Sequence, residues 1–234
     1  MAGGSYLRWA GPGRARHLWF GAGLALIWLA LETPIDTVGD RSLQSVHMLQ
    51  HVLLGLVAPP MLLLGLDAHA ARRLLARIPL LERVCSPLWA QLIAALVMVG
   101  WHLPPLYDLT ARSAPVHVLE HLSFIAAGIA FWWPVLEGTG ASLTPPLSEA
   151  WKAIYIFIGT VPQDGVALVL QFSRRLFYSQ YANEPVHLAG WTPVIDQNVA
   201  GAVLMVIGKT SFAVALLALF FRWMARETAS APGT

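Results

Sequence analysis

The sequence predicts an all-α fold, a polytopic membrane bundle of about six transmembrane helices with both termini in the cytoplasm. Three observations predict it. Hydrophobic residues make up 56% of the 234 residues and charged residues only 12%, about half the charged fraction of a soluble domain. The mean hydropathy is +0.59, and apolar runs of about 20 residues recur, which is the length that crosses hydrocarbon as a helix. The third observation is the uneven distribution of basic residues between the connecting segments.

The apolar runs define a single integral membrane domain over residues 1–234. Its spans are expected at about 18–33, 44–66, 87–103, 115–136, 151–172 and 195–221. The first run follows a basic segment and resembles a signal peptide. Because Glu32-Thr33-Pro34 lacks the small residues of a cleavage site, we interpret it as a retained, somewhat short helix.

Prolines predict irregularities in three places. Pro59-Pro60 lies inside the second span and should kink it, since proline removes a helical hydrogen bond. Pro104-Pro105 should end the third span just after His102, leaving a short loop through residues 107–112. The segment 161–165, which contains Pro162, should interrupt the fifth span.

The basic residues orient the bundle. Six spans put both termini on one side, and ten basic residues fall on that side: Arg8, Arg14, Arg16, Arg72, Arg73, Arg77, Arg83, Lys152, Arg222 and Arg226. Only four fall in the other three connections: Arg41, Arg112, Arg174 and Arg175. The positive-inside rule therefore places both termini in the cytoplasm. The small net charge of +2 gives no reason to expect a nucleic-acid partner.

Two near-identical motifs carry the candidate chemistry. V-H-M-L-Q-H begins at Val46 and V-H-V-L-E-H begins at Val116. Histidines four residues apart lie on one face of a helix, about 6 Å from each other, and can share a metal ion. The predicted topology brings both pairs and one further histidine to the extracytoplasmic side, so the candidate metal ligands are His47, His51, His102, His117 and His121.

Neighbouring polar residues extend this candidate site. Met48 is a soft ligand or a packing residue, Gln50 and Glu120 either orient an imidazole or face water, and Asp196 either binds metal or caps a helix. His187 and Gln197 also fall on the outer side. Deeper in the membrane, Asp164 and Lys209 are expected to pair, because an isolated charge there costs several kcal/mol. That pair is either structural or part of an ion path.

Imidazole ligands suit copper, zinc, iron and nickel. One histidine pair alone is equally explained by a structural role, whereas two pairs and His102 on one side favour a metal or cofactor. The single cysteine, Cys85, excludes an intrachain disulfide and a thiolate cluster within the chain.

Four ordered segments resemble the integral membrane CtaG family of cytochrome c oxidase assembly factors, the kind associated with caa-type oxidases. They are S-V-H-M-L-Q-H-V-L-L-G-L-V-A-P-P-M-L-L-L-G from Ser45, W-H-L-P-P-L-Y-D from Trp101, V-H-V-L-E-H-L-S-F from Val116 with F-W-W-P-V from Phe131, and D-Q-N-V-A-G from Asp196. The resemblance covers about residues 44–221. Its matching polar positions are the five histidines and Asp196.

The resemblance implies a multi-pass protein of the bacterial plasma membrane that helps to build an active haem-copper oxidase, with copper as the metal handled. It implies an oxidase subunit as partner, and it leaves open a periplasmic copper donor and a homo-oligomer. A metallochaperone or assembly factor is favoured over an enzyme.

Two other functions fit the same histidines. A membrane zinc hydrolase would hold zinc with three histidines and use Glu120 or Asp196 as general base. A haem protein would use His51 and His121 as axial ligands, although paired histidines on one helix suit a small ion better.

Overall fold

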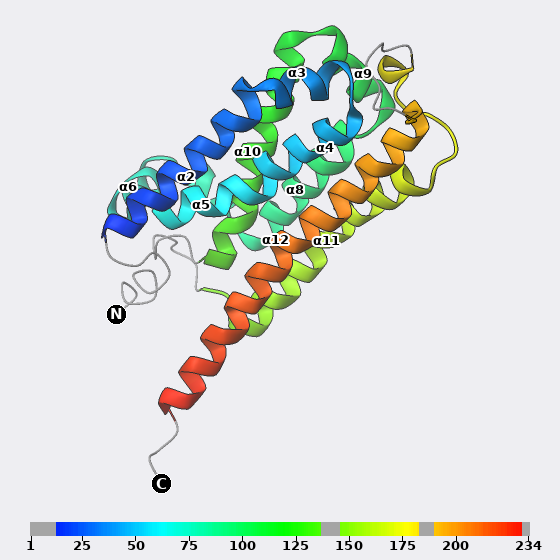
Figure 1. Ribbon diagram of the computed structural model, residues 1–234. Coiled ribbons are helices and arrows are strands. Elements are labelled where there is room, and N and C mark those ends of the chain that lie inside the picture. The colour runs from blue at the N-terminus through cyan, green and yellow to red at the C-terminus, as the bar shows by residue number, and fades with distance from the viewer. Residues whose placement is uncertain (1–12, 137–145, 183–189, 231–234) are drawn as a thin grey trace.

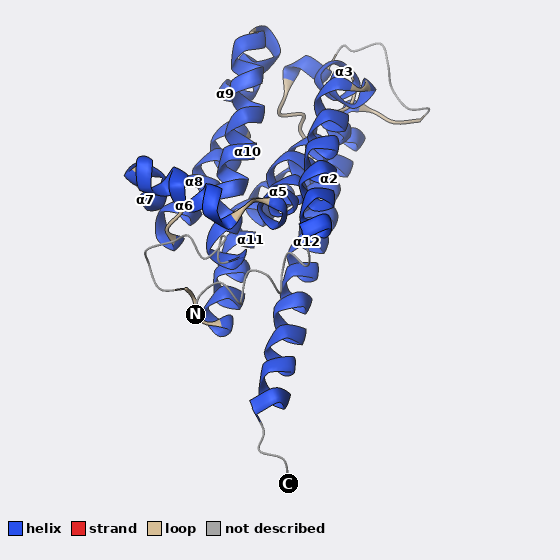
Figure 2. Ribbon diagram, turned by 90° about the vertical axis from the view of Figure 1, so that its left-hand side faces the viewer, coloured by secondary structure: helices blue, strands red, loops and turns tan. Residues whose placement is uncertain are grey.

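The computed structural model describes residues 13–136, 146–182 and 190–230. Within these ranges the regular structure is entirely helical, as expected, and the long helices lie side by side in an elongated bundle (Figures 1 and 2). The last helix extends beyond the rest of the bundle at one end (Figure 1).

The chain enters the bundle through a bent helix pair. α2 (Gly13–Glu32) and α3 (Pro34–Arg41) meet at an angle of 46°. Thr33 makes the junction, because its hydroxyl accepts a hydrogen bond from the Ile35 amide and Pro34 occupies the first helical position. α2 packs along α5 (Ala58–Gly65).

The second span carries its distortion before the two prolines. It consists of α4 (Gln44–Val52), the π-helical turn η1 (Leu53–Val57) and α5. Pro59 has no amide hydrogen and its ring would press on the carbonyl four residues earlier, so a wider turn relieves the crowding. Gln44–Gly65 remains one candidate span of 22 residues. The distortion expected at Pro59-Pro60 thus takes the form of a π-helical turn.

The next segment contains more helix than expected. α6 (Ala68–Arg77) and α7 (Pro79–Val84) form the basic connection to α8 (Pro87–Trp101). The loop predicted through Tyr107 and Arg112 is instead α9 (Pro104–Arg112). That prediction was wrong because the fixed φ of proline fits the first turn of a helix. The two prolines therefore begin α9 as well as ending α8.

Three long helices complete the bundle. They are α10 (Ala114–Leu136), α11 (Glu149–Phe172) and α12 (Pro193–Ser230). The predicted interruption at Pro162 was wrong, because α11 runs through the proline without a break. α11 packs along α12, and α10 packs against α8 and α5.

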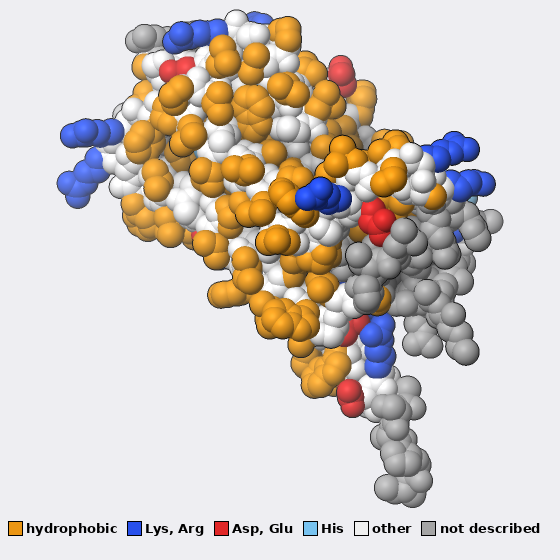
Figure 3. Space-filling model, turned by 180° about the vertical axis from the view of Figure 1, so that it is seen from behind, with side chains coloured by type: hydrophobic (Ala, Val, Ile, Leu, Met, Phe, Trp, Pro, Cys, Tyr) orange, Lys and Arg blue, Asp and Glu red, His pale blue; other side chains and the backbone are white. Residues whose placement is uncertain are grey.

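The lengths agree with a multi-pass membrane protein. Among the described residues, four helices are long and apolar enough to cross a membrane, and the count becomes six if each bent pair is one span: α2 with α3, and α8 with α9 at 71°. Figure 3 shows one face covered mostly by hydrophobic side chains, with charged side chains few and mainly toward its margins.

The fold brings three helix ends together. The beginnings of α4 and α10 and the end of α8 lie at the end of the bundle near α3 and α9 (Figure 1). α2 begins, and α12 ends, toward the opposite end of the bundle (Figure 1). The five candidate histidines therefore come from three elements at one end of the molecule.

Candidate metal centre

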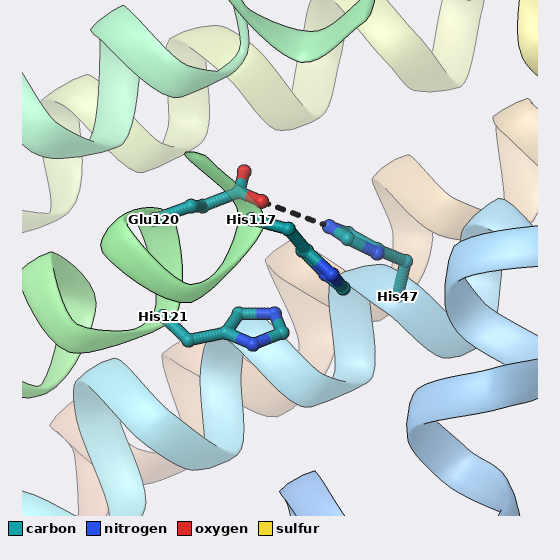
Figure 4. Close-up of side chains that lie close together, drawn as sticks. All are labelled: His47, His117, Glu120 and His121. Atoms are coloured by element: carbon teal, nitrogen blue, oxygen red, sulfur yellow. Dashed lines mark ion pairs between the residues drawn. The ribbon is translucent and has the colours of Figure 1, made fainter. Parts of the chain in front are cut away.

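α4 and α10 face each other with their histidine pairs. His47 and His51 lie one turn apart on α4, and His117, Glu120 and His121 lie on one face of α10. Figure 4 shows His47 reaching from α4 toward the three α10 side chains. His47, His51, Glu120 and His121 are buried, and His117 is partly buried.

Four of these residues fit around one metal ion. One donor atom each from His47, His117, Glu120 and His121 can be chosen so that all four atoms lie within 4.8 Å of one another. Donors in a tetrahedral site, about 2.0–2.1 Å from the ion, lie about 3.4 Å apart. Small rotamer adjustments would therefore close this group, which we call the His3Glu group, around an ion.

The cluster contains many buried polar atoms that make no hydrogen bond. Among the described residues they include eight nitrogen and oxygen atoms of five side chains: His47 Nδ1 and Nε2, His51 Nδ1 and Nε2, His117 Nε2, Glu120 Oε1 and Oε2, and His121 Nε2. Each unmade bond at a buried group costs about 1–3 kcal/mol. A bound cation removes that cost for the one donor atom that each ligand residue offers it.

Glu120 lies between two histidines of the facing helix. Its Oε2 is 3.7 Å from His47 Nε2, and its Oε1 is 3.4 Å from His51 Nε2 (Figure 4 marks the first). Glu120 has no exposed surface. The structure places this carboxylate inside the cluster, among the histidine nitrogens, and not facing water.

His102 and Met48 form the other side of the cluster. His102 Nδ1 lies 2.6 Å from the Met98 carbonyl oxygen, so this nitrogen carries the proton and Nε2 presents a lone pair. His102 Nε2 lies 3.1 Å from the Met48 sulfur. A backbone carbonyl that fixes the tautomer in this way is typical of metal-binding histidines.

Asp196 does not reach the cluster; it caps α4 from α12. Leu43 precedes α4, and its apolar side chain cannot accept hydrogen bonds from the first amides of the helix. Asp196 accepts hydrogen bonds from the amides of Gln44 (2.6 Å) and Ser45 (3.3 Å) and from the Ser45 hydroxyl (2.5 Å). The negative charge also suits the positive end of the helix dipole. The cap fixes the helix terminus three residues before His47.

Gln50 fixes the same helix from another side. Its amide nitrogen donates to the Ala30 carbonyl oxygen and to the Asp36 carboxylate, both at 2.8 Å. These contacts tie α4 to the junction of α2 and α3. Gln50 thus holds the backbone that carries His47 and His51.

Three tyrosines, which the sequence did not single out, cover the cluster. Tyr107 lies 5.4 Å from His47 between ring centroids and stacks on Tyr178 at 3.8 Å. Tyr107 and Tyr181 share a hydrogen bond of 2.9 Å, and Tyr178 donates to the His102 carbonyl oxygen at 2.8 Å. Burial raises the pKa of Tyr178 and Tyr181, so both remain neutral donors. The sequence feature that could have indicated this cover is Tyr107, which lies in the P-P-L-Y-D segment.

The residues after Asp196 hold this cover in place. Gln197 accepts from the Phe177 amide and donates to the Arg175 carbonyl oxygen, at 2.8 and 2.9 Å. Asn198 donates to the Leu170 and Ser173 carbonyl oxygens. Gln197 is therefore an anchor for the segment that carries Tyr178. His187 lies outside the described residues.

Two other polar residues highlighted by the sequence lie elsewhere. Asp164 and Lys209 pair at 2.7 Å between α11 and α12, as expected, but both side chains are partly exposed on the outside of the bundle. They do not lie beneath the histidines as an internal path. Cys85 precedes α8, at the other end of that helix from His102, and burial raises the pKa of its thiol to about 11.

The family model of the cytochrome c oxidase caa3 assembly factor, Caa3_CtaG, matches residues 2–226, nearly the whole chain. The chain belongs to this family. It is therefore a cytochrome c oxidase assembly factor with an oxidase as its partner, which confirms the resemblance seen in the sequence. No curated protein and no solved structure shows significant similarity to the chain.

Proposed function

We propose that this Caa3_CtaG member binds copper in the histidine cluster and supplies it during assembly of the oxidase metal centre. The observation that carries the proposal is the His3Glu group, whose buried donors make no hydrogen bonds and lie within 4.8 Å of one another. Imidazole binds copper and zinc alike. Membership in an oxidase assembly family favours copper as the cargo.

The cluster suits transfer better than permanent storage. His117 is only partly buried, and the α9 segment with its tyrosine partners lies over the cluster. A site that must release its ion benefits from one accessible ligand, because a partner's donor can replace it in a stepwise exchange. We assign that role to His117, and the oxidase subunit or a copper donor on the same side supplies the exchanging ligand.

We propose that the cluster faces the extracytoplasmic side of the bacterial plasma membrane. The basic residues number ten on the side of the termini and four on the other. The helix ends that carry the histidines, of α4, α8 and α10, lie at the end of the bundle opposite the beginning of α2 (Figure 1). A membrane-impermeant maleimide should label a Ser113→Cys variant in intact cells, in a Cys85→Ser background. Ser113 lies between α9 and α10, beside the cluster end. Labelling that requires cell lysis would contradict this orientation.

The function is tested by copper delivery in cells that make the oxidase. In cells that carry the His47→Ala/His51→Ala variant in place of the wild-type protein, the purified oxidase should contain less copper per haem. The variant lacks both of the histidines that α4 contributes to the cluster. His17→Ala is the matched control, since His17 is exposed on α2 at the other end of the bundle. A fully loaded and active oxidase in cells with the double variant, made in normal amount, would refute the proposal.

A further inference from the structure

We propose that the cluster holds two ions in two different sites: the His3Glu group and a softer site formed by Met48, His51 and His102. This inference rests on the proposed copper function and adds a second site with its own preference. The second site would favour Cu(I), because a thioether is a soft ligand that selects monovalent copper.

The His102 ring makes two contacts, one through each nitrogen. Its Nδ1 faces a carbonyl oxygen at 2.6 Å and its Nε2 faces a thioether sulfur at 3.1 Å. Both neighbours are acceptors, whereas a neutral imidazole has one proton to donate. Nδ1 keeps that proton and donates it in a hydrogen bond to the carbonyl oxygen, so the Nε2 lone pair is directed at the sulfur lone pairs. A cation between these two atoms turns an unfavourable contact into two bonds.

Distance and burial agree with this interpretation. Bonds of about 2.0 Å to nitrogen and 2.3 Å to sulfur place tetrahedral donors about 3.5 Å apart, so the His102–Met48 contact needs to open by only a few tenths of an ångström. Met48 is completely buried and His102 is 6% exposed. Water is thus largely excluded from this pair of donors.

His47 and Met48 direct the two sites to different sides of α4. His47 and Met48 are adjacent, so their side chains diverge by about 100°. His47 meets the α10 residues, and Met48 meets His102 at the end of α8. His51 follows Met48 by three residues and His47 by four, so it lies between these two sides of the helix, with its ring 4.3 Å from that of His47. The His51 ring lies 5.4 Å from that of His102 and makes no hydrogen bond.

Glu120 connects the two sites. One carboxylate oxygen approaches His47 of the His3Glu group, and the other approaches His51 of the soft site. A carboxylate with its two oxygens directed to different ligand sets is the arrangement that bridges neighbouring ions. The bridge gives copper a short route from the soft site to the His3Glu group.

The test uses the full-length protein in detergent, titrated with Cu(I) under reductant against a competing chelator and examined by X-ray absorption. Wild type should bind two ions per chain and show a sulfur neighbour at about 2.3 Å. Met48→Leu, which nearly preserves side-chain volume, should bind one ion and lose the sulfur signal. Met205→Leu, a partly buried methionine of α12, should behave as wild type.

The outcomes separate the two proposals. One ion per wild-type chain, with nitrogen and oxygen neighbours only and no change in Met48→Leu, would overturn the second site and leave the proposed function standing. A single ion that includes sulfur would also overturn the division into two sites. Wild type that takes up no copper would refute the proposed function itself. The sulfur signal is read on wild type alone, so the test holds even if Met48→Leu folds poorly.

Discussion

At the residue scale, Asp196 shows how a distant side chain positions the candidate metal ligands. It satisfies two backbone amides and a hydroxyl at the beginning of α4, although it belongs to α12. The residue that precedes α4 is Leu43, whose side chain cannot accept these hydrogen bonds. The placement of His47, three residues after Gln44, therefore depends on a contact between two helices far apart in the sequence.

Removing this cap should cost both stability and copper affinity. Asp196→Ala leaves two buried amides and the Ser45 hydroxyl without their acceptor, and hydrogen bonds to charged groups contribute about 1.5–3 kcal/mol. We expect a clear fall in the thermal unfolding temperature in detergent and weaker copper binding. Ser45→Ala removes only the hydroxyl contact and should have a smaller effect. Unchanged unfolding and copper affinity in Asp196→Ala would contradict the capping role.

Residue patterns revealed the histidines but not all of their surroundings. A spacing of four predicts that His47 and His51, and likewise His117 and His121, share a helix face, because this is a local property of the helix. The contact of Met48 with His102 joins residues 54 positions apart, and the tyrosine contacts join α9 to the segment before α12. Such contacts depend on how helices pack, which a single sequence does not specify.

At the element scale, α10 lies unusually close to the η1 and α5 part of the second span, one to two turns below the histidines. A Cβ atom added at Gly128 would collide with the carbonyl oxygen of Gly55 and lie 2.6 Å from Pro59 Cγ. The contact falls where η1 widens the second span. Glycine at this position lets α10 and the second span, which carry the histidine pairs, come together.

Gly128→Ala should therefore separate these helices. Because the obstructing atoms belong to backbone and a proline ring, the neighbours cannot simply rotate away, and overpacking of this kind costs about 1–3 kcal/mol. We expect a lower unfolding temperature and weaker copper binding. Gly165→Ala is the matched control, since a Cβ there meets nothing within 4 Å. Equal unfolding temperatures for the two variants would show that the close approach is not required.

Proline effects explain the incorrect element predictions. Pro104-Pro105 was interpreted as a helix end, but the pair also begins α9, because a first helical turn needs no amide donors. Pro162 was interpreted as a break, but α11 continues through it. The sequence identifies where a helical hydrogen bond is missing, whereas packing against α12 and α8 determines whether the helix continues.

At the scale of the whole molecule, the ion pairs between α11 and α12 lie away from the histidine cluster. The Asp164–Lys209 pair joins α11 to α12 on the outer surface of the bundle. Glu149 of α11 pairs with Arg226 of α12 at 2.6 Å, at the end where α12 leaves the bundle. These contacts hold two long helices together and leave the histidine cluster as the candidate site for chemistry in the described part of the chain.

Metal analysis of the purified full-length chain is the most direct test of copper binding by the histidine cluster. Wild type, His47→Ala/His51→Ala and the control His17→Ala would be purified after growth with copper and analysed for copper and zinc per chain. We expect copper in wild type and in His17→Ala, and its loss from the double variant. Equal copper in wild type and the double variant, or none in wild type even after titration, would contradict this expectation.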